Sequence, residues 1–129
     1  MTAEEYLMQV KDIDLRIRSL EGELHDTEAE NDTAYAEELQ KHIKADIVRF
    51  KQLKLQIREE IQQLRDNRDS TLLIEYYIRG KSWEQVAQAL DMKDVKNVRD
   101  GMRKRALESF SRKFSKRFQN SALNTLKSP

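Results

Sequence analysis

The fold is decided by residues 72–106, which read LLIEYYIRGKSWEQVAQALDMKDVKNVRDGMRKRA. Apolar residues recur at helical spacing on both sides of Gly80, a residue type that commonly follows the end of a helix. Ser82 and Gln85 then have the spacing of a capping box, in which each side chain bonds a free backbone donor of the opening turn. The stretch therefore predicts two short helices that meet at a glycine-containing corner.

A third helix is expected after a turn at residues 91–94. Its inward face is marked by apolar residues at helical spacing, namely Val95, Val98, Met102 and Ala106. The small Ala87 in the preceding helix would let another helix cross closely. A short helix, a tight turn and a basic amphipathic helix follow the order of a helix-turn-helix, which places its second helix in the major groove of DNA. A three-helix bundle without a ligand is the alternative.

The opposite face of this third helix carries side chains that can contact DNA. Asn can pair with adenine, Asp can accept from cytosine, and Lys or Arg can contact guanine or phosphate. Gly101 would let the backbone approach DNA closely, a simple bend or early fraying being the alternative. The candidate DNA-contacting residues here are Lys93, Lys96, Asn97, Asp100, Arg103 and Lys104.

Phe110, Phe114 and Phe118 fall four residues apart among basic residues and indicate one more amphipathic helix. We expect the phenylalanines to pack on this protein's own helices or on a second subunit. Stacking on bases or lying on an anionic membrane is the alternative. The cations of this segment complete the candidate DNA-binding set: Arg112, Lys113, Lys116 and Arg117.

Residues 1–66 predict a long helical hairpin. Thr2 and Glu5 have capping-box spacing. Two apolar stripes follow at alternating spacings of three and four, the pattern of helices that pack along a partner: Ala3, Tyr6, Val10, Ile13, Ile17, Leu20 and Leu24, then Leu39, Ile43, Ile47, Phe50, Leu53, Ile57, Ile61 and Leu64. The acidic stretch 26–32 interrupts them, and Asp32 or Thr33 can cap a second helix. One continuous helix in a parallel coiled coil is the alternative.

The charge is distributed unevenly along the chain. Residues 96–129 hold ten bases and two acids, a net charge of +8, whereas the whole chain carries only +1. The first 95 residues are therefore acidic, at −7. A basic end on an acidic protein is typical of a polyanion partner.

Composition excludes several classes of function. There is no cysteine, and no phosphate-binding loop, nucleophile motif or cluster of metal ligands is found, so we expect a non-enzymatic protein without metal or cofactor. Apolar runs are too short for a membrane span or a signal peptide, which favours the cytoplasm. The expected fold is all-α: a hairpin and oligomerisation module at 1–66, a helix-turn-helix domain with a basic C-terminal helix at 67–119, and a flexible tail at 120–129.

Two stretches resemble the RinA/ArpU-type regulators encoded by phages of Gram-positive bacteria. These are the opening residues 1–7 (MTAEEYL) with the apolar positions that follow, and residues 72–87, in which 80–84 (GKSWE) are the most specific. Residues 77–87 are also similar to the helix-turn-helix of sigma factor region four. The resemblance covers most of residues 1–107 and implies an activator of late transcription in a bacterial host. The chain departs from the sigma-like pattern in a turn one residue longer after Leu90, and in Asp-Gly-Met at 100–102.

The leading hypothesis is a sequence-specific transcription regulator that binds duplex DNA as a homo-oligomer, with a dimer favoured. A small terminase-like DNA-packaging subunit is one alternative, because such proteins also join a helix-turn-helix to oligomerising helices. A sigma-like protein that engages host RNA polymerase without reading DNA alone is another. The mass in solution separates the first two, since a dimer favours the regulator and a ring of eight or more favours packaging.

Overall fold

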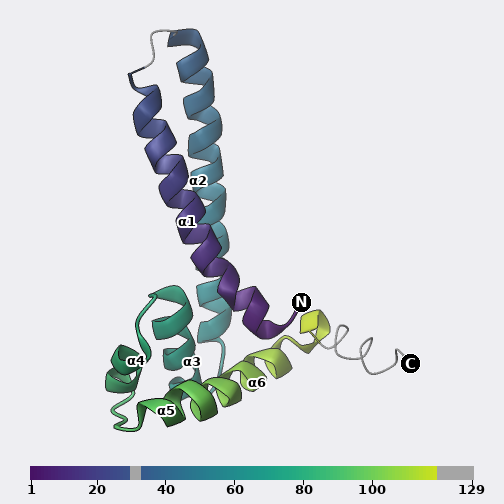
Figure 1. Ribbon diagram of the computed structural model, residues 1–129. Coiled ribbons are helices and arrows are strands. Elements are labelled where there is room, and N and C mark those ends of the chain that lie inside the picture. Colours follow the sequence, from purple (N-terminus) through teal and green to yellow (C-terminus); the bar gives the residue numbers. More distant parts are fainter. Residues whose placement is uncertain (30–32, 119–129) are drawn as a thin grey trace, which may run out of the picture.

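The computed structural model describes residues 1–29 and 33–118, and every regular element in those ranges is helical (Figure 1). The all-α prediction is confirmed. The helices are α1 (Ala3–Thr27), α2 (Thr33–Gln62), α3 (Asn67–Leu73), α4 (Trp83–Ala89), α5 (Val95–Asn97) and α6 (Arg103–Lys113). A π-helical turn, η1 (Ile74–Ile78), extends α3, and a second, η2 (Val98–Met102), joins α5 to α6. The tail expected at 120–129 lies outside the described residues.

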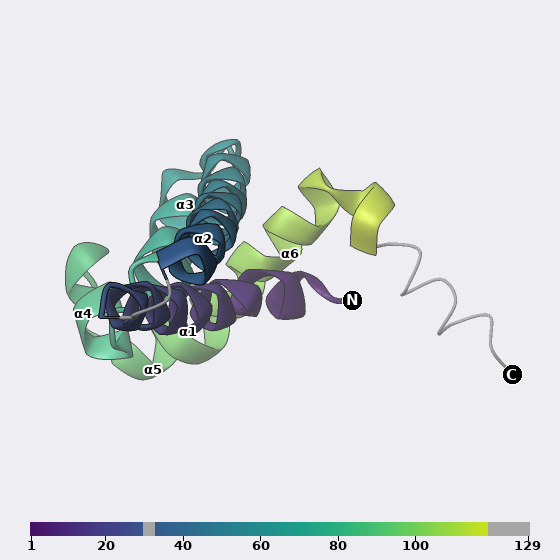
Figure 2. The ribbon, with the colours of Figure 1, turned by 90° about the horizontal axis from the view of Figure 1, so that it is seen from above.

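The long helices α1 and α2 lie side by side and run in opposite directions (Figures 1 and 2). The capping box at the start of α1 is confirmed, with Thr2 and Glu5 each accepting the other's backbone N–H at 3.1 Å. Between the helices lie buried residues at helical spacing: Val10, Ile13, Ile17 and Leu20 of α1 with Ile43, Ile47, Ile57 and Ile61 of α2. The partly buried Phe50 and Leu53 continue the α2 stripe between Ile47 and Ile57. Leu7, which the predicted stripe omitted, is fully buried, whereas Tyr6 is only partly buried.

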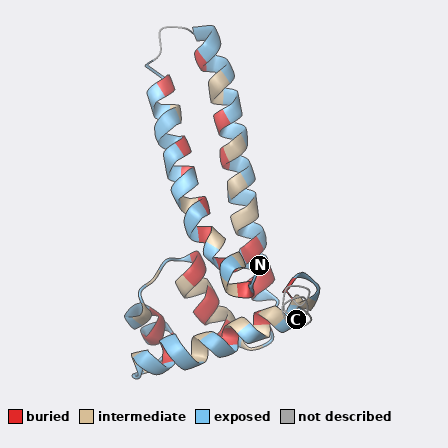
Figure 3. Ribbon diagram, turned by 45° about the vertical axis from the view of Figure 1, so that its right-hand side comes forward, coloured by how far each residue is buried: buried red, intermediate tan, exposed pale blue. Residues whose placement is uncertain are grey.

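The C-terminal helices pack around one core that also includes the base of α1 and α2. Tyr77, Val86, Val98 and Ala106 join Leu7, Val10, Ile57 and Ile61 in a single buried cluster. Figure 3 shows this buried region at the junction, with alternating buried and exposed residues higher on the two long helices. The core therefore crosses residue 66, and the base of the long helices is part of the platform that holds α3 to α6.

Two residues in the left-handed region turn the chain between the short helices. Gly80 (φ 67°) follows η1, which confirms the prediction that a helix ends at this glycine. The predicted capping box of Ser82 and Gln85 then starts α4. Asp91 (φ 56°) follows α4, and the N–H of Met92 closes the turn on the carbonyl of Ala87 at 2.9 Å. These turns bring α4 against α5 and η2.

The separate amphipathic helix predicted for Phe110 to Phe118 is wrong. Phe110 belongs to α6, which follows α5 and η2 without a break. Phe114 ends the helix (φ −114°, ψ 42°), and residues 115–118 form one further turn. The expectation that the phenylalanines pack on the protein's own helices is confirmed for Phe110 and Phe118, whose buried rings contact Tyr6.

Within residues 1–29 and 33–118, none of the helices combines the length and the apolar character that a membrane span requires.

Candidate nucleic-acid interface

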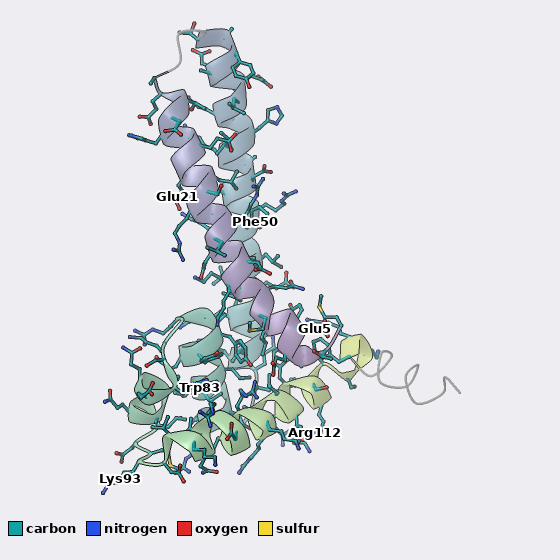
Figure 4. All side chains as sticks on the ribbon, viewed as in Figure 1. Glu5, Glu21, Phe50, Trp83, Lys93 and Arg112 are labelled. Carbon is teal, nitrogen blue, oxygen red and sulfur yellow. The ribbon has the colours of Figure 1, made fainter. Side chains whose placement is uncertain are left out.

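The elements α5, η2 and α6 form one continuous helical stretch, here called the basic helix. Its start lies at the end of the molecule opposite the far ends of α1 and α2 (Figure 1). Asp94 caps it, its carboxylate accepting the N–H of Asn97 at 3.0 Å. Buried Val98 holds the helix to the core, and α4 packs against α5 and η2 from one side. The remaining sides of this first turn are left to solvent, and the labelled Lys93 stands at the extreme edge of the molecule (Figure 4).

Most of the predicted contact residues on this helix are exposed. The exposed set is Lys93, Lys96, Asn97, Asp100, Gly101 and Lys104. Within the described residues, Lys93, Lys96 and Lys104 form no ion pair. A hollow of about 240 Å³ is lined by residues of this set together with Asp94. The start of the helix thus presents the exposed Lys96 and the Asn97 amide beside the carboxylates of Asp94 and Asp100, with Lys93 and Lys104 exposed before and after them in the chain.

Asp100 is engaged by a neighbour that the sequence analysis did not select. Arg99 donates from Nε and Nη2 to the two carboxylate oxygens of Asp100 at 2.9 and 3.2 Å. The hydrogen bond from Arg99, with the nearby charges of Lys96 and Arg103, holds the pKa of Asp100 below its usual range. Asp100 therefore stays charged, and any base contact by it must compete with an exposed guanidinium.

Arg103 is held by the N-terminal helix. Its Nη1 pairs with Glu4 Oε2 at 2.9 Å, and its Nε donates to the carbonyl of Arg99 at 2.9 Å. The side chain is about one-third exposed. Arg103 therefore joins the first turn of α1 to the basic helix.

Arg117 is likewise held by the long helices. Its guanidinium pairs with Glu60, which also accepts the hydroxyl of Tyr6, and it lies over the rings of Tyr6 and Phe114. Burial would raise the pKa of Glu60, but hydrogen bonds from Arg117 and Tyr6 and the charge of Arg117 hold it below its usual range. Burial, with the Glu60 contact, raises the pKa of Tyr6 to about 12. These three residues fasten residues 115–118 to α1 and α2.

The other predicted cations lie far from the start of the helix. Arg112, Lys113 and Lys116 are exposed, and Figure 4 shows Arg112 at the opposite end of the basic helix from Lys93. The structure therefore separates the predicted set into three parts: an exposed group around Asn97, a second exposed group around Arg112, and two arginines paired with carboxylates of α1 and α2.

No family model matches the chain, and neither a curated protein nor a solved structure has significant similarity to it.

Proposed function

We propose that this protein is a sequence-specific DNA-binding regulator of transcription, in which α4 and the basic helix from α5 to α6 act as a helix-turn-helix on duplex DNA. The observation that carries the proposal is the exposed surface around Lys96 and Asn97 of α5, which lies at the end of the molecule opposite the far ends of α1 and α2 (Figure 1). An amide can read adenine in the major groove, and lysines can hold guanine or phosphate. α4, packed across the start of that helix, would lie over the DNA backbone.

The charge pattern supports a nucleic acid as the partner. The +8 of residues 96–129 lies partly on the exposed helix described above, whereas α1, with seven acids and three bases, extends away from the start of that helix (Figure 1). Such a separation orients a protein toward a polyanion and keeps the acidic part away from it. The resemblance to RinA/ArpU-type regulators adds a role in late phage transcription, with host RNA polymerase as a second partner in the bacterial cytoplasm.

The long helices suit a pairing role. Leu15 of α1 is 60% exposed, and Val48 and Leu55 of α2 are each 53% exposed. Val48 and Leu55 lie seven residues apart and so share one outer strip of α2, the spacing that helices use to associate. A homodimer formed through these helices would present two copies of the basic helix to DNA.

Duplex-DNA binding at several salt concentrations tests the proposal. The test variant is Lys93→Ala/Lys96→Ala/Lys104→Ala. The matched control is Lys41→Ala/Lys44→Ala/Lys51→Ala, which removes the same charge from exposed positions of α2. Each lost phosphate contact reduces the slope of log K against log salt by about 0.9. We therefore expect weaker binding and a flatter slope in the test variant, with the control close to wild type.

Absence of DNA binding by the wild-type protein at low salt would exclude the proposal. Equal losses in the two triple variants would attribute binding to net charge rather than to this helix.

A further inference from the structure

A hollow of about 500 Å³ opens beside α6, where its lining extends from Arg105 to Lys113. Its basic lining comes from two parts of the chain: Arg65 in the connection between α2 and α3, and Arg105, Arg112 and Lys113 on α6. We call it the basic hollow. It brings together cations that lie some forty to fifty residues apart in the sequence.

The carboxylates in the basic hollow are already engaged. Asp66 caps α3, accepting the N–H of Arg68 at 2.8 Å, and its other oxygen pairs with Arg105 at 3.1 Å. Asp69 is buried and accepts the hydroxyl of Ser109 at 2.8 Å. Four cations face two carboxylates, so the hollow carries a surplus of positive charge.

Three cations of the basic hollow remain available. Arg65, Arg112 and Lys113 are exposed and form no ion pair within the described part of the chain. Two guanidinium groups and an ammonium group around one concave surface suit a tetrahedral oxyanion, because Arg binds phosphate oxygens in a bidentate manner and Lys adds a point charge.

The basic hollow is continuous with the exposed surface around Asn97 that we propose contacts bases. A second hollow, of about 220 Å³, is lined by Asn97, Met92 and Met102 and shares Asp66, Asp69 and Arg105 with the first. The pair between Arg105 and Asp66 stands where the two hollows meet. One trough therefore runs along the side of the basic helix from Asn97 to Arg112.

We propose that the basic hollow binds backbone phosphates of duplex DNA that flank the bases contacted by the start of the basic helix. The inference depends on the proposed function, and it adds Arg65 to the DNA contacts. The distance also fits a flanking contact. Fifteen residues of helix separate Asn97 from Arg112, a rise of about 22 Å, which exceeds the roughly 12 Å width of the major groove.

The test compares DNA binding by wild type and by Arg65→Ala/Arg112→Ala/Lys113→Ala on a duplex several helical turns long. The control is again Lys41→Ala/Lys44→Ala/Lys51→Ala. We expect the salt slope of the hollow variant to fall by about 2.7, from three contacts at about 0.9 each. Its affinity should drop alike for every sequence, because phosphate contacts carry no base information. A thermal melt verifies that each variant is folded.

A second arm separates this inference from the proposed function. On a duplex shortened to the selected site without flanks, wild type and the hollow variant should bind alike, because the flanking phosphates are gone. If the hollow variant matches wild type in salt slope and affinity on the long duplex, the inference is overturned. That result is also expected if the basic hollow binds a small phosphate-bearing molecule and not DNA. In that case the loss in Lys93→Ala/Lys96→Ala/Lys104→Ala still supports the proposed function. If the wild-type protein binds no DNA, both the inference and the proposed function are excluded.

Discussion

The side-chain oxygen Oδ1 of Asn97 lies 2.8 Å from the point where a Cβ atom at position 101 would stand. Gly101 therefore leaves the space that the Asn97 amide occupies on the exposed face of the basic helix. A methyl group at 101 would have to displace the amide. It can do so without moving the backbone, because Oδ1 is the far end of a flexible side chain.

Gly101→Ala is expected to separate stability from DNA reading. Ala favours a helix over Gly by up to about 1 kcal/mol, so the free energy of unfolding should stay level or rise. Discrimination between DNA sequences should fall, because the Asn97 amide is displaced. Urea unfolding and titrations of selected and random duplexes measure the two effects.

Gly22→Ala is the matched control for this substitution. Gly22 is an exposed position in α1 with nothing within 4 Å of its would-be Cβ. It should gain stability without any effect on DNA. A large loss of stability in Gly101→Ala, or unchanged sequence discrimination, would contradict the role given to the pair.

Asp91→Gly is expected to stabilise the protein. Asp91 holds a positive φ of 56° immediately after α4, where a side chain is strained and glycine is not. Its negative charge is also unfavourable near the C-terminal end of a helix. We expect the free energy of unfolding to rise by about 0.5–1 kcal/mol, whereas Asp91→Ala, which removes the charge but keeps the strain, should be less stable than Asp91→Gly. Equal stability of the two variants in urea unfolding would count against this assignment.

The pairing of Glu60 predicts a pH-dependent contribution to stability. The pKa of Glu60 is lowered from its ordinary value of 4.5, so the unfolded chain takes up this proton more readily than the folded one. The paired carboxylate stabilises the fold above about pH 4.5 and loses this effect as the pH falls through the lowered folded-state pKa. Glu60→Gln should therefore cost about 1–3 kcal/mol at neutral pH.

The difference in unfolding free energy between wild type and Glu60→Gln should shrink in acid. Urea unfolding of both proteins across a pH series measures it. A difference that stays constant from neutral to strongly acidic pH would show that the ionised pair with Arg117 contributes nothing.

The elements predicted correctly from the sequence are those set by residues close together in the chain. Both capping boxes and the corner at Gly80 depend on side chains and backbone within a few residues, so their spacing is visible directly. The apolar stripes of α1 and α2 are visible for the same reason, since helical periodicity alone determines which residues share a face.

The parts that could not be predicted depend on tertiary packing. Arg103 looked like a DNA contact, but its partner Glu4 lies 99 residues away, and Arg117 pairs with Glu60 across 57 residues. The first pair joins the start of α1 to the start of α6, and the second joins the end of α2 to residues 115–118. Both depend on how these elements meet at the shared core, which no periodic pattern encodes. The basic hollow was missed likewise, because Arg65 reaches α6 only through the turn between α2 and α3.

The central claim is that the start of the basic helix reads bases, and Asn97→Ala tests it most directly. Affinities of wild type and Asn97→Ala are measured at one salt concentration for a site selected from random duplexes and for an unselected duplex. We expect a loss of about 1–3 kcal/mol on the selected site with non-specific affinity nearly unchanged, because a base contact carries sequence information. Lys104→Ala, run in parallel, should weaken both duplexes alike. If Asn97→Ala keeps the full preference of wild type for the selected site, the helix does not read bases through Asn97 and the claim is contradicted.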